Sequence, residues 1–189
     1  MKLIGLIFLV FLSGCAYIDQ NLRVEPQVTI MQENIGQGKK IALRVVDDRE
    51  DSTIGRRANG YGMDSAKIST DQDLVELLKS SFIDGMRKKG FEPVGDNDSN
   101  VSLKVELRSL SYDTSTGLWT AGNIGKAALK ILATKESNKT FEKTYRSQNE
   151  IRTAFIASQE TNAKIINAAL SDALNKVFSD NELWDFLIQ

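Results

Sequence analysis

The chain has 189 residues, 41% of them apolar, and its 24 lysines and arginines nearly balance its 25 aspartates and glutamates. This balance of charge argues against a nucleic-acid partner, and the apolar fraction argues against a disordered chain. The sequence contains no histidine, which excludes Ser-His-Asp triads and histidine-ligated zinc. Cys15 is the single cysteine, so the fold must form without disulfides.

The first 15 residues have the pattern of a lipoprotein export signal. Lys2 precedes an apolar run, Leu3 to Leu12, that is about half the ~20 residues a transmembrane helix needs. The run closes with Ser13-Gly14-Cys15, which completes a lipobox. We therefore predict that residues 1–14 are removed and that Cys15 carries a diacylglycerol thioether and an N-linked acyl chain such as palmitate. Three acyl chains would anchor the protein almost irreversibly.

Ala16 follows the predicted lipid-bearing cysteine. In enteric-type bacteria an Asp at this position favours retention in the inner membrane, so Ala16 favours the periplasmic face of the outer membrane. We interpret residues 15–25 as the lipidated N-terminus and a tether, and residues 26–189 as a single domain, since this length suits one hydrophobic core. The alternative for residues 1–15 is a short buried helix with an ordinary core cysteine.

Alternating apolar residues predict strands at 26–30 and 40–46. Residues 47–66 begin with an acidic run and are rich in Gly and Asn, which predicts a long exposed loop. Thr70 and Asp73 resemble a capping box, and Lys88-Lys89-Gly90 supplies a cationic last turn with a glycine stop. An amphipathic helix is predicted between them.

The second half of the chain predicts a short strand at 91–94 and an antiparallel meander of three strands around 101–108, 127–133 and 141–151, with 112–124 as a loop. A long amphipathic helix is predicted from about Thr161, followed by a short terminal turn that folds back on the core. We therefore predict an α+β fold, with a mainly antiparallel sheet of four to six strands and two amphipathic helices packed on one face.

Candidate contact residues lie in the two predicted loops. Large aromatic and Arg side chains anchor many protein interfaces, which makes such residues in loops candidates for partner binding. In loop 112–124 the aromatic and apolar pair Leu118-Trp119 could instead plug the end of the sheet, and the arginines of loop 47–66 could simply be solvated. The candidates are Arg56, Arg57, Tyr61, Tyr112, Leu118 and Trp119.

Two acidic clusters raise the question of a cation site. The first could bind a divalent cation through oxygen ligands or be a solvated loop held by Arg49, and we favour the loop. The second, which begins at Asp96, starts like a calcium loop but has Val101 at the glycine position and Leu107 at the final glutamate position. We predict no metal, cofactor or catalytic residues. The first cluster comprises Asp47, Asp48, Glu50 and Asp51.

Several segments resemble the YajG family of bacterial lipoproteins. The resemblance spans most of the chain after the export signal, and it implies an outer-membrane-associated lipoprotein without implying a mechanism. The segments that carry it are Val46-Asp47-Asp48-Arg49 with Ile54-Gly55, Asp73-Leu74 through Gly95, Tyr145-Arg146-Ser147 with Ala154 to Ser158, and Asp185-Phe186-Leu187.

The sequence thus predicts a non-enzymatic binding or accessory module of the cell envelope, held to the membrane through Cys15, with an envelope protein or a glycan as its partner. One alternative is a carrier that holds an apolar ligand between helices and sheet. A cell-wall or lipid hydrolase is less favoured, because the chain lacks histidine and a free thiol.

Overall fold

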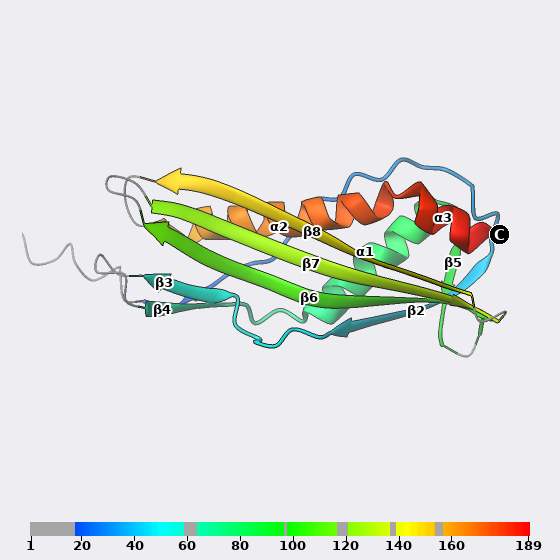
Figure 1. The fold of residues 1–189 in the computed structure, drawn as a ribbon, viewed down its shortest axis with the longest axis horizontal. Coiled ribbons are helices and arrows are strands. Elements are labelled where there is room, and N and C mark those ends of the chain that lie inside the picture. Colours follow the sequence, from blue (N-terminus) through cyan, green and yellow to red (C-terminus); the bar gives the residue numbers. More distant parts are fainter. Residues whose placement is uncertain (1–17, 59–63, 97, 117–120, 137–138, 154–156) are drawn as a thin grey trace, which may run out of the picture.

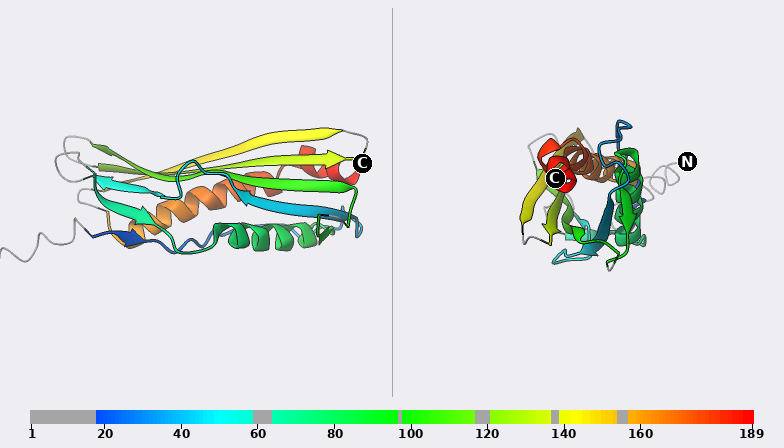
Figure 2. Two further views of the ribbon diagram at one scale, coloured as in Figure 1. Left: turned by 90° about the horizontal axis from the view of Figure 1, so that it is seen from below. Right: turned by 90° about the vertical axis from the view of Figure 1, so that its right-hand side faces the viewer.

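The computed structural model describes residues 18–189 apart from 59–63, 97, 117–120, 137–138 and 154–156. One eight-stranded sheet runs along the molecule, and three helices lie on one side of it (Figures 1 and 2). The strands are β1 (Gln20–Asn21), β2 (Lys40–Asp47), β3 (Gly55–Ala58), β4 (Asp64–Ser69), β5 (Glu92–Val94), β6 (Val101–Thr116), β7 (Ala121–Lys135) and β8 (Thr140–Thr153). The helices are α1 (Leu74–Lys88), α2 (Gln159–Phe178) and α3 (Asn181–Ile188).

The long strands β6, β7 and β8 form the antiparallel meander that the sequence predicts, with Val105 opposite Ile131 and Ile131 opposite Lys143. Leu103 and Val105 are fully buried on the face toward the helices. On the other face Glu106 is paired with Lys104. One face of the meander is therefore core and the other is polar, as the alternation of residue types requires.

The predicted sheet of four to six mainly antiparallel strands with two helices is wrong, although the chain is α+β. Eight strands are described, and four of their seven pairings are parallel: β1 with β4, β2 with β5, β2 with β6, and β3 with β6. Alternation of apolar residues identifies a strand but not the direction of its neighbour. Here β2 and β3 reach the same edge of β6 through long crossover segments, and such connections give parallel pairs.

Both segments predicted as loops contain strands. Residues 47–66 include β3 and the start of β4, and the buried Ile54 donates its backbone N–H to Ile68 O (3.0 Å). Residues 112–116 belong to β6 and residues 121–124 to β7. Conversely, the predicted strand 26–30 does not join the sheet. Few large apolar residues mark β3 and β4, so their pairing is decided by the neighbouring strands.

The helices begin and end close to their predicted positions. The Asp73 carboxylate caps α1 by accepting from Val75 N and Glu76 N, and Gly90 follows the helix with φ of +83°. The Ser158 hydroxyl caps α2 by accepting from Thr161 N. A Cβ atom on Gly85 of α1 would collide with the ring of Phe178, the last residue of α2, and with Ile30 of the segment that precedes β2. Glycine therefore leaves room on α1 for these two side chains.

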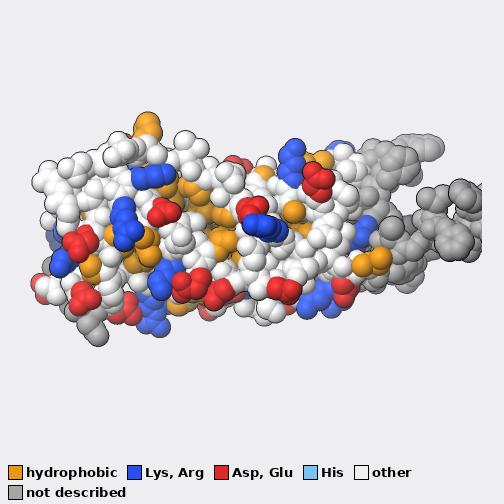
Figure 3. Space-filling model, turned by 180° about the vertical axis from the view of Figure 1, so that it is seen from behind, with side chains coloured by type: hydrophobic (Ala, Val, Ile, Leu, Met, Phe, Trp, Pro, Cys, Tyr) orange, Lys and Arg blue, Asp and Glu red, His pale blue; other side chains and the backbone are white. Residues whose placement is uncertain are grey.

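Residues 22–36 form an extended segment, here called the strap, that runs along the helix layer between α1 and α2 (Figure 2). Leu22 and Val24 at its start are buried in the core. Val24 also exchanges hydrogen bonds with the Gln72 side chain next to α1. From the side of the helices, apolar side chains gather in the middle of the face among charged residues (Figure 3). The strap therefore helps to cover the core.

A ladder of polar side chains on α2 fixes the other edge of the strap. The backbone N–H groups of Glu25, Gln27 and Thr29 donate to Asn167 Oδ1 (2.8 Å), Ser171 Oγ (2.8 Å) and Asn175 Oδ1 (3.0 Å). Four helical residues rise about 6 Å, and two residues of an extended chain about 6.7 Å. Because these repeats nearly match, one helix face can bind every second amide of the strap.

We expect loss of the ladder to loosen the strap without unfolding the sheet. Ser171→Ala removes the acceptor of the Gln27 amide and should cost about 1 kcal/mol of the free energy of unfolding, with similar costs for Asn167→Ala and Asn175→Ala. Hydrogen exchange of the strap amides should accelerate in each variant. Lys164→Ala, an exposed change on the same helix, is the control. Unchanged exchange in the triple variant would contradict the role of the ladder.

Candidate functional site

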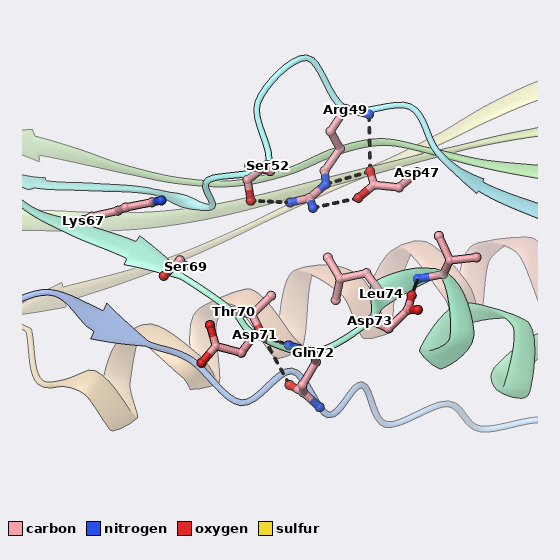
Figure 4. Close-up of a pocket in the computed structure, with 11 residues that line it drawn as sticks. Asp47, Arg49, Ser52, Lys67, Ser69, Thr70, Asp71, Gln72, Asp73 and Leu74 are labelled. Atoms are coloured by element: carbon pink, nitrogen blue, oxygen red, sulfur yellow. Dashed lines mark hydrogen bonds and ion pairs between the residues drawn. The ribbon is translucent and has the colours of Figure 1, made fainter.

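A polar cleft of about 350 Å³ lies where the loop after β2, the end of β4 and the start of α1 meet (Figure 4). The cleft forms at this place because β2 ends at Asp47 and the chain rejoins the sheet only at Gly55, where β3 begins. The residues that line it are Asp47, Arg49, Ser52, Lys67, Ser69, Thr70, Asp71, Gln72, Asp73, Leu74 and Val75.

The Arg49 guanidinium is the most buried charge of the cleft, with only 7% of its side chain exposed. It donates from Nε to Asp47 Oδ1 and from Nη2 to Asp47 Oδ2, both at 2.8 Å, and from Nη1 to Ser52 O at 3.3 Å. These hydrogen bonds from Arg49 outweigh the effect of burial and lower the pKa of Asp47 below its ordinary value. Arg49 therefore holds the loop onto the end of β2.

The other carboxylates of the cleft also have partners. Asp73 caps α1, so the positive end of the helix dipole already faces a carboxylate of the chain itself. Asp71 accepts a hydrogen bond from Asn21 Nδ2. The groups left for a ligand are the exposed Lys67, whose amine has no partner among the described residues, and the Ser69 hydroxyl beside it. The cleft can therefore bind one small anionic or polar group.

The acidic cluster that the sequence singled out is spread over separate contacts. Asp48 pairs with Arg108, and Asp51 accepts hydrogen bonds from the backbone and hydroxyl of Thr53. Among the described residues, no group of three or more acidic, Cys or His side chains could hold a metal ion. Pairing with Arg49 and Arg108 holds this loop.

The predicted contact residues do not form one surface. Arg56 is exposed on β3, whereas Arg57 is 7% exposed and donates to Ala157 O (3.3 Å). Tyr112 is 3% exposed and donates to Asn123 Oδ1 (2.6 Å), and its burial raises the pKa of the phenol to about 12. Arg57 and Tyr112 thus lie inside the fold. Cys15, Tyr61, Leu118 and Trp119 lie outside the described residues.

Sequence reasoning missed the groups that build the cleft. Lys67 and Ser69 lie between the predicted loop 47–66 and the predicted helix and belong to no predicted element, yet they alternate with the buried Ala66 and Ile68, which is the pattern of a strand. Arg49 is predicted to hold a solvated loop, and its burial in a cleft is not. Its position two residues after Asp47, at the end of a strand, was the available signal for a tight local ion pair.

Comparisons with known proteins place the chain among bacterial lipoproteins. It is 26% identical over 188 residues to the uncharacterised lipoprotein YajG of Escherichia coli strain K12, which covers 99% of this chain and 96% of that protein. The YajG of E. coli O6:H1 strain CFT073 gives the same values. The crystal structure of protein XCC0632 from Xanthomonas campestris covers 90% of this chain and 94% of its own at 17% identity, with a TM-score of 0.50. This likeness shows a shared fold.

The class of protein is therefore an α+β lipoprotein of the bacterial envelope. A family model described as "Uncharacterized lipoprotein" matches residues 26–188, and the chain belongs to the YajG family, as the resemblance in the sequence indicates. Membership fits a membrane-anchored location. No helix in the described part of the chain is long and apolar enough to cross a membrane.

Asp47 and Asp48 give a matched test of the cleft. Asp47→Ala leaves the buried guanidinium of Arg49 without its carboxylate and should cost about 1–3 kcal/mol of the free energy of unfolding. Asp48→Ala removes a pair that is about half exposed and should cost less than about 1 kcal/mol. Chemical denaturation of both variants beside the wild type gives these differences.

The cost of Asp47→Ala should depend on pH. Because the folded state lowers the pKa of Asp47, its contribution is present above the ordinary aspartate value and is lost as the pH falls through the folded value. The gap to the wild type should therefore narrow between pH 7 and about pH 3. An equal cost for the two variants, or a gap that does not change with pH, would argue against this assignment.

Proposed function

We propose that this protein is a non-enzymatic binding module, anchored by lipid on Cys15 to the periplasmic face of the outer membrane, that holds an envelope protein or glycan. The observation that carries the proposal is where the fold starts. β1 begins at Gln20, and Leu22 and Val24 are already in the core. Five residues span at most about 17 Å, so acyl chains on Cys15 would keep the folded part close to the membrane.

The position of the first strand also orients the molecule. β1 pairs with β4, at the end of the sheet that carries β3, the end of β6 and the start of β7 (Figure 1). The opposite end carries β5 and α3. With a tether this short, the β3–β4 end faces the membrane and the β5–α3 end faces the periplasm, where it is available to partners.

The chemistry of the described residues supports binding over catalysis. The carboxylates of the cleft are used in a cap, an ion pair and an amide contact. A lysine that acts as a general base is normally buried, and Lys67 is exposed. The carrier of an apolar ligand that the sequence left open would need space between sheet and helices. That space is filled by side chains such as Leu78, Phe82 and Leu129.

The anchor can be tested by fractionation of a Gram-negative host on a sucrose gradient. The wild type should sediment with the outer membrane, and intact mass should show the acyl chains. Cys15→Ala should leave the outer-membrane fractions, and Ala16→Asp should move the protein to the inner membrane, whereas Ala16→Ser should not move it. Outer-membrane sedimentation of Cys15→Ala, or no acyl mass on the wild type, would overturn the anchor.

The binding role can be tested by photo-crosslinking in living cells. A photoreactive residue at the exposed position Ile188 of α3, at the end that faces the periplasm, should trap a discrete adduct in the wild type. The adduct should weaken by about 10-fold or more in Cys15→Ala, because the lipid raises the effective concentration at the membrane. The same residue at Lys130, on the polar sheet face, serves as the comparison. Absence of adducts from both positions would count against a protein partner and direct the search to glycans.

A further inference from the structure

The edge of β2 is open beyond the short strand β5. β5 pairs with Lys40, Ile41 and Ala42 only, and the chain then turns away, with Asp98 N donating to Gly95 O (3.1 Å). From Leu43 to Asp47, β2 pairs with β6 on one edge and with no described strand on the other. The open edge is thus five residues long, about 17 Å.

The hydrogen bonds at the start of β2 fix which way its backbone faces. Glu92 N donates to Lys39 O (3.0 Å) on the β5 side, and Ser99 Oγ donates to Lys40 O (2.7 Å) on the β6 side. Because backbone groups alternate along a strand, Leu43 and Val45 direct their N–H and C=O groups to the open edge. The parallel pairing of Ala42 with Val94 takes up the Leu43 N–H. Within the described residues, the three groups without a hydrogen-bond partner are the C=O of Leu43 and the N–H and C=O of Val45.

A groove of about 550 Å³ lies along this edge. β2 contributes Leu43 and Val45, both half-buried, and α1 contributes the apolar side chains Val75 and Ile83. The other charged residues that line the groove are the Lys79–Glu76 pair, Arg44 and Asp96, and the last two are exposed without an ion-pair partner among the described residues. Asp96 follows β5, whereas Arg44 lies between Leu43 and Val45 in the open stretch of β2. The open stretch therefore combines free backbone groups, an apolar wall and one unpaired positive charge.

The other long edge of the sheet is protected. The outer edge of β8 has a carbonyl, Arg146 O, that accepts from Lys176 Nζ (2.7 Å). Charged side chains, among them Lys143, Arg146 and Arg152, follow β8 along its length. Capping and charge are the means by which proteins prevent strands from adding to an edge. In the open part of β2, Leu43 to Asp47, the charged residues are Arg44 and the terminal Asp47, which is paired with Arg49, and there is no proline or glycine. The stretch from Leu43 to Val46 therefore lacks this protection.

We propose that the β2 groove binds an extended, acidic segment of a partner protein, which adds to the sheet as a strand in line with β5. Its backbone pairs with the C=O of Leu43 and with the N–H and C=O of Val45, which is the mode of β-strand addition. Apolar side chains at alternate positions pack against Val75 and Ile83. Acidic side chains at the other positions face Arg44.

The test uses the lipidated protein in detergent and a fluorescein-labelled peptide of alternating Glu and Val, seven residues long. Fluorescence anisotropy should show saturable binding, and hydrogen exchange should show new protection of the Val45 amide. A peptide of alternating Lys and Val should bind about 3-fold more weakly, and Arg44→Glu should invert this preference. A Glu-Val peptide methylated on its backbone nitrogens should lose about 10-fold or more of the affinity.

Arg146→Glu on the β8 edge is the matched control, and it should leave both affinities unchanged. Equal binding of the methylated peptide, protection centred on β8, or no binding at millimolar peptide would overturn the proposal. So would a stable dimer whose Val45 amide is protected without peptide, because a second copy would then occupy the groove. Peptide binding in detergent does not depend on the outer membrane, so this proposal and the proposed anchor can fail separately.

Discussion

The rest of the structure depends on a match of spacing between α2 and the strap. Four residues of the helix rise about as far as two residues of the extended strap, so side chains on one helix face meet every second strap amide. The sheet buries one face only, and α1 and α2 leave a gap that an extended chain must fill. An extended chain outside a sheet needs partners for its amides, since unpaired buried amides are costly. Asn167, Ser171 and Asn175 supply them. The strap in turn places the start of the fold at β1.

This arrangement packs the N-terminal strap against the C-terminal helices, and it bears on how an anchor on Cys15 would orient the fold. The strap contacts α2, and α2 leads into α3, where the Asp180 carboxylate accepts from Tyr145 Oη (2.5 Å) and pairs with Lys143 (2.7 Å). The N-terminal segment, the C-terminal helices and β8 are therefore one packed unit. Because the strap is part of that unit, a short segment separates the fold from Cys15, and the lipid would set the orientation of the whole module.

Some polar groups of the molecule hold its segments together, and others remain exposed and available to a binding partner. Arg49 and Arg57, which look alike in sequence as loop arginines, are both buried and hold segments together. Arg44 lies within a strand and looks structural, yet it is exposed beside an open edge. Edges and junctions between elements, where hydrogen bonding stops, are thus more informative about binding in this protein than its loops.

Local sequence determined what depends on nearest neighbours: the helices with their Asp73 and Ser158 caps, the alternation of β6, β7 and β8, the lipobox pattern and the family resemblance. Tertiary structure alone decided the parallel pairing of β2 and β3 with β6, because strand direction is set by distant segments. It also decided that the segment 26–30 binds a helix instead of a strand. The positions of Tyr112 and Arg57 inside the fold, and the open edge at Leu43 and Val45, follow from that pairing and cannot be read from local pattern.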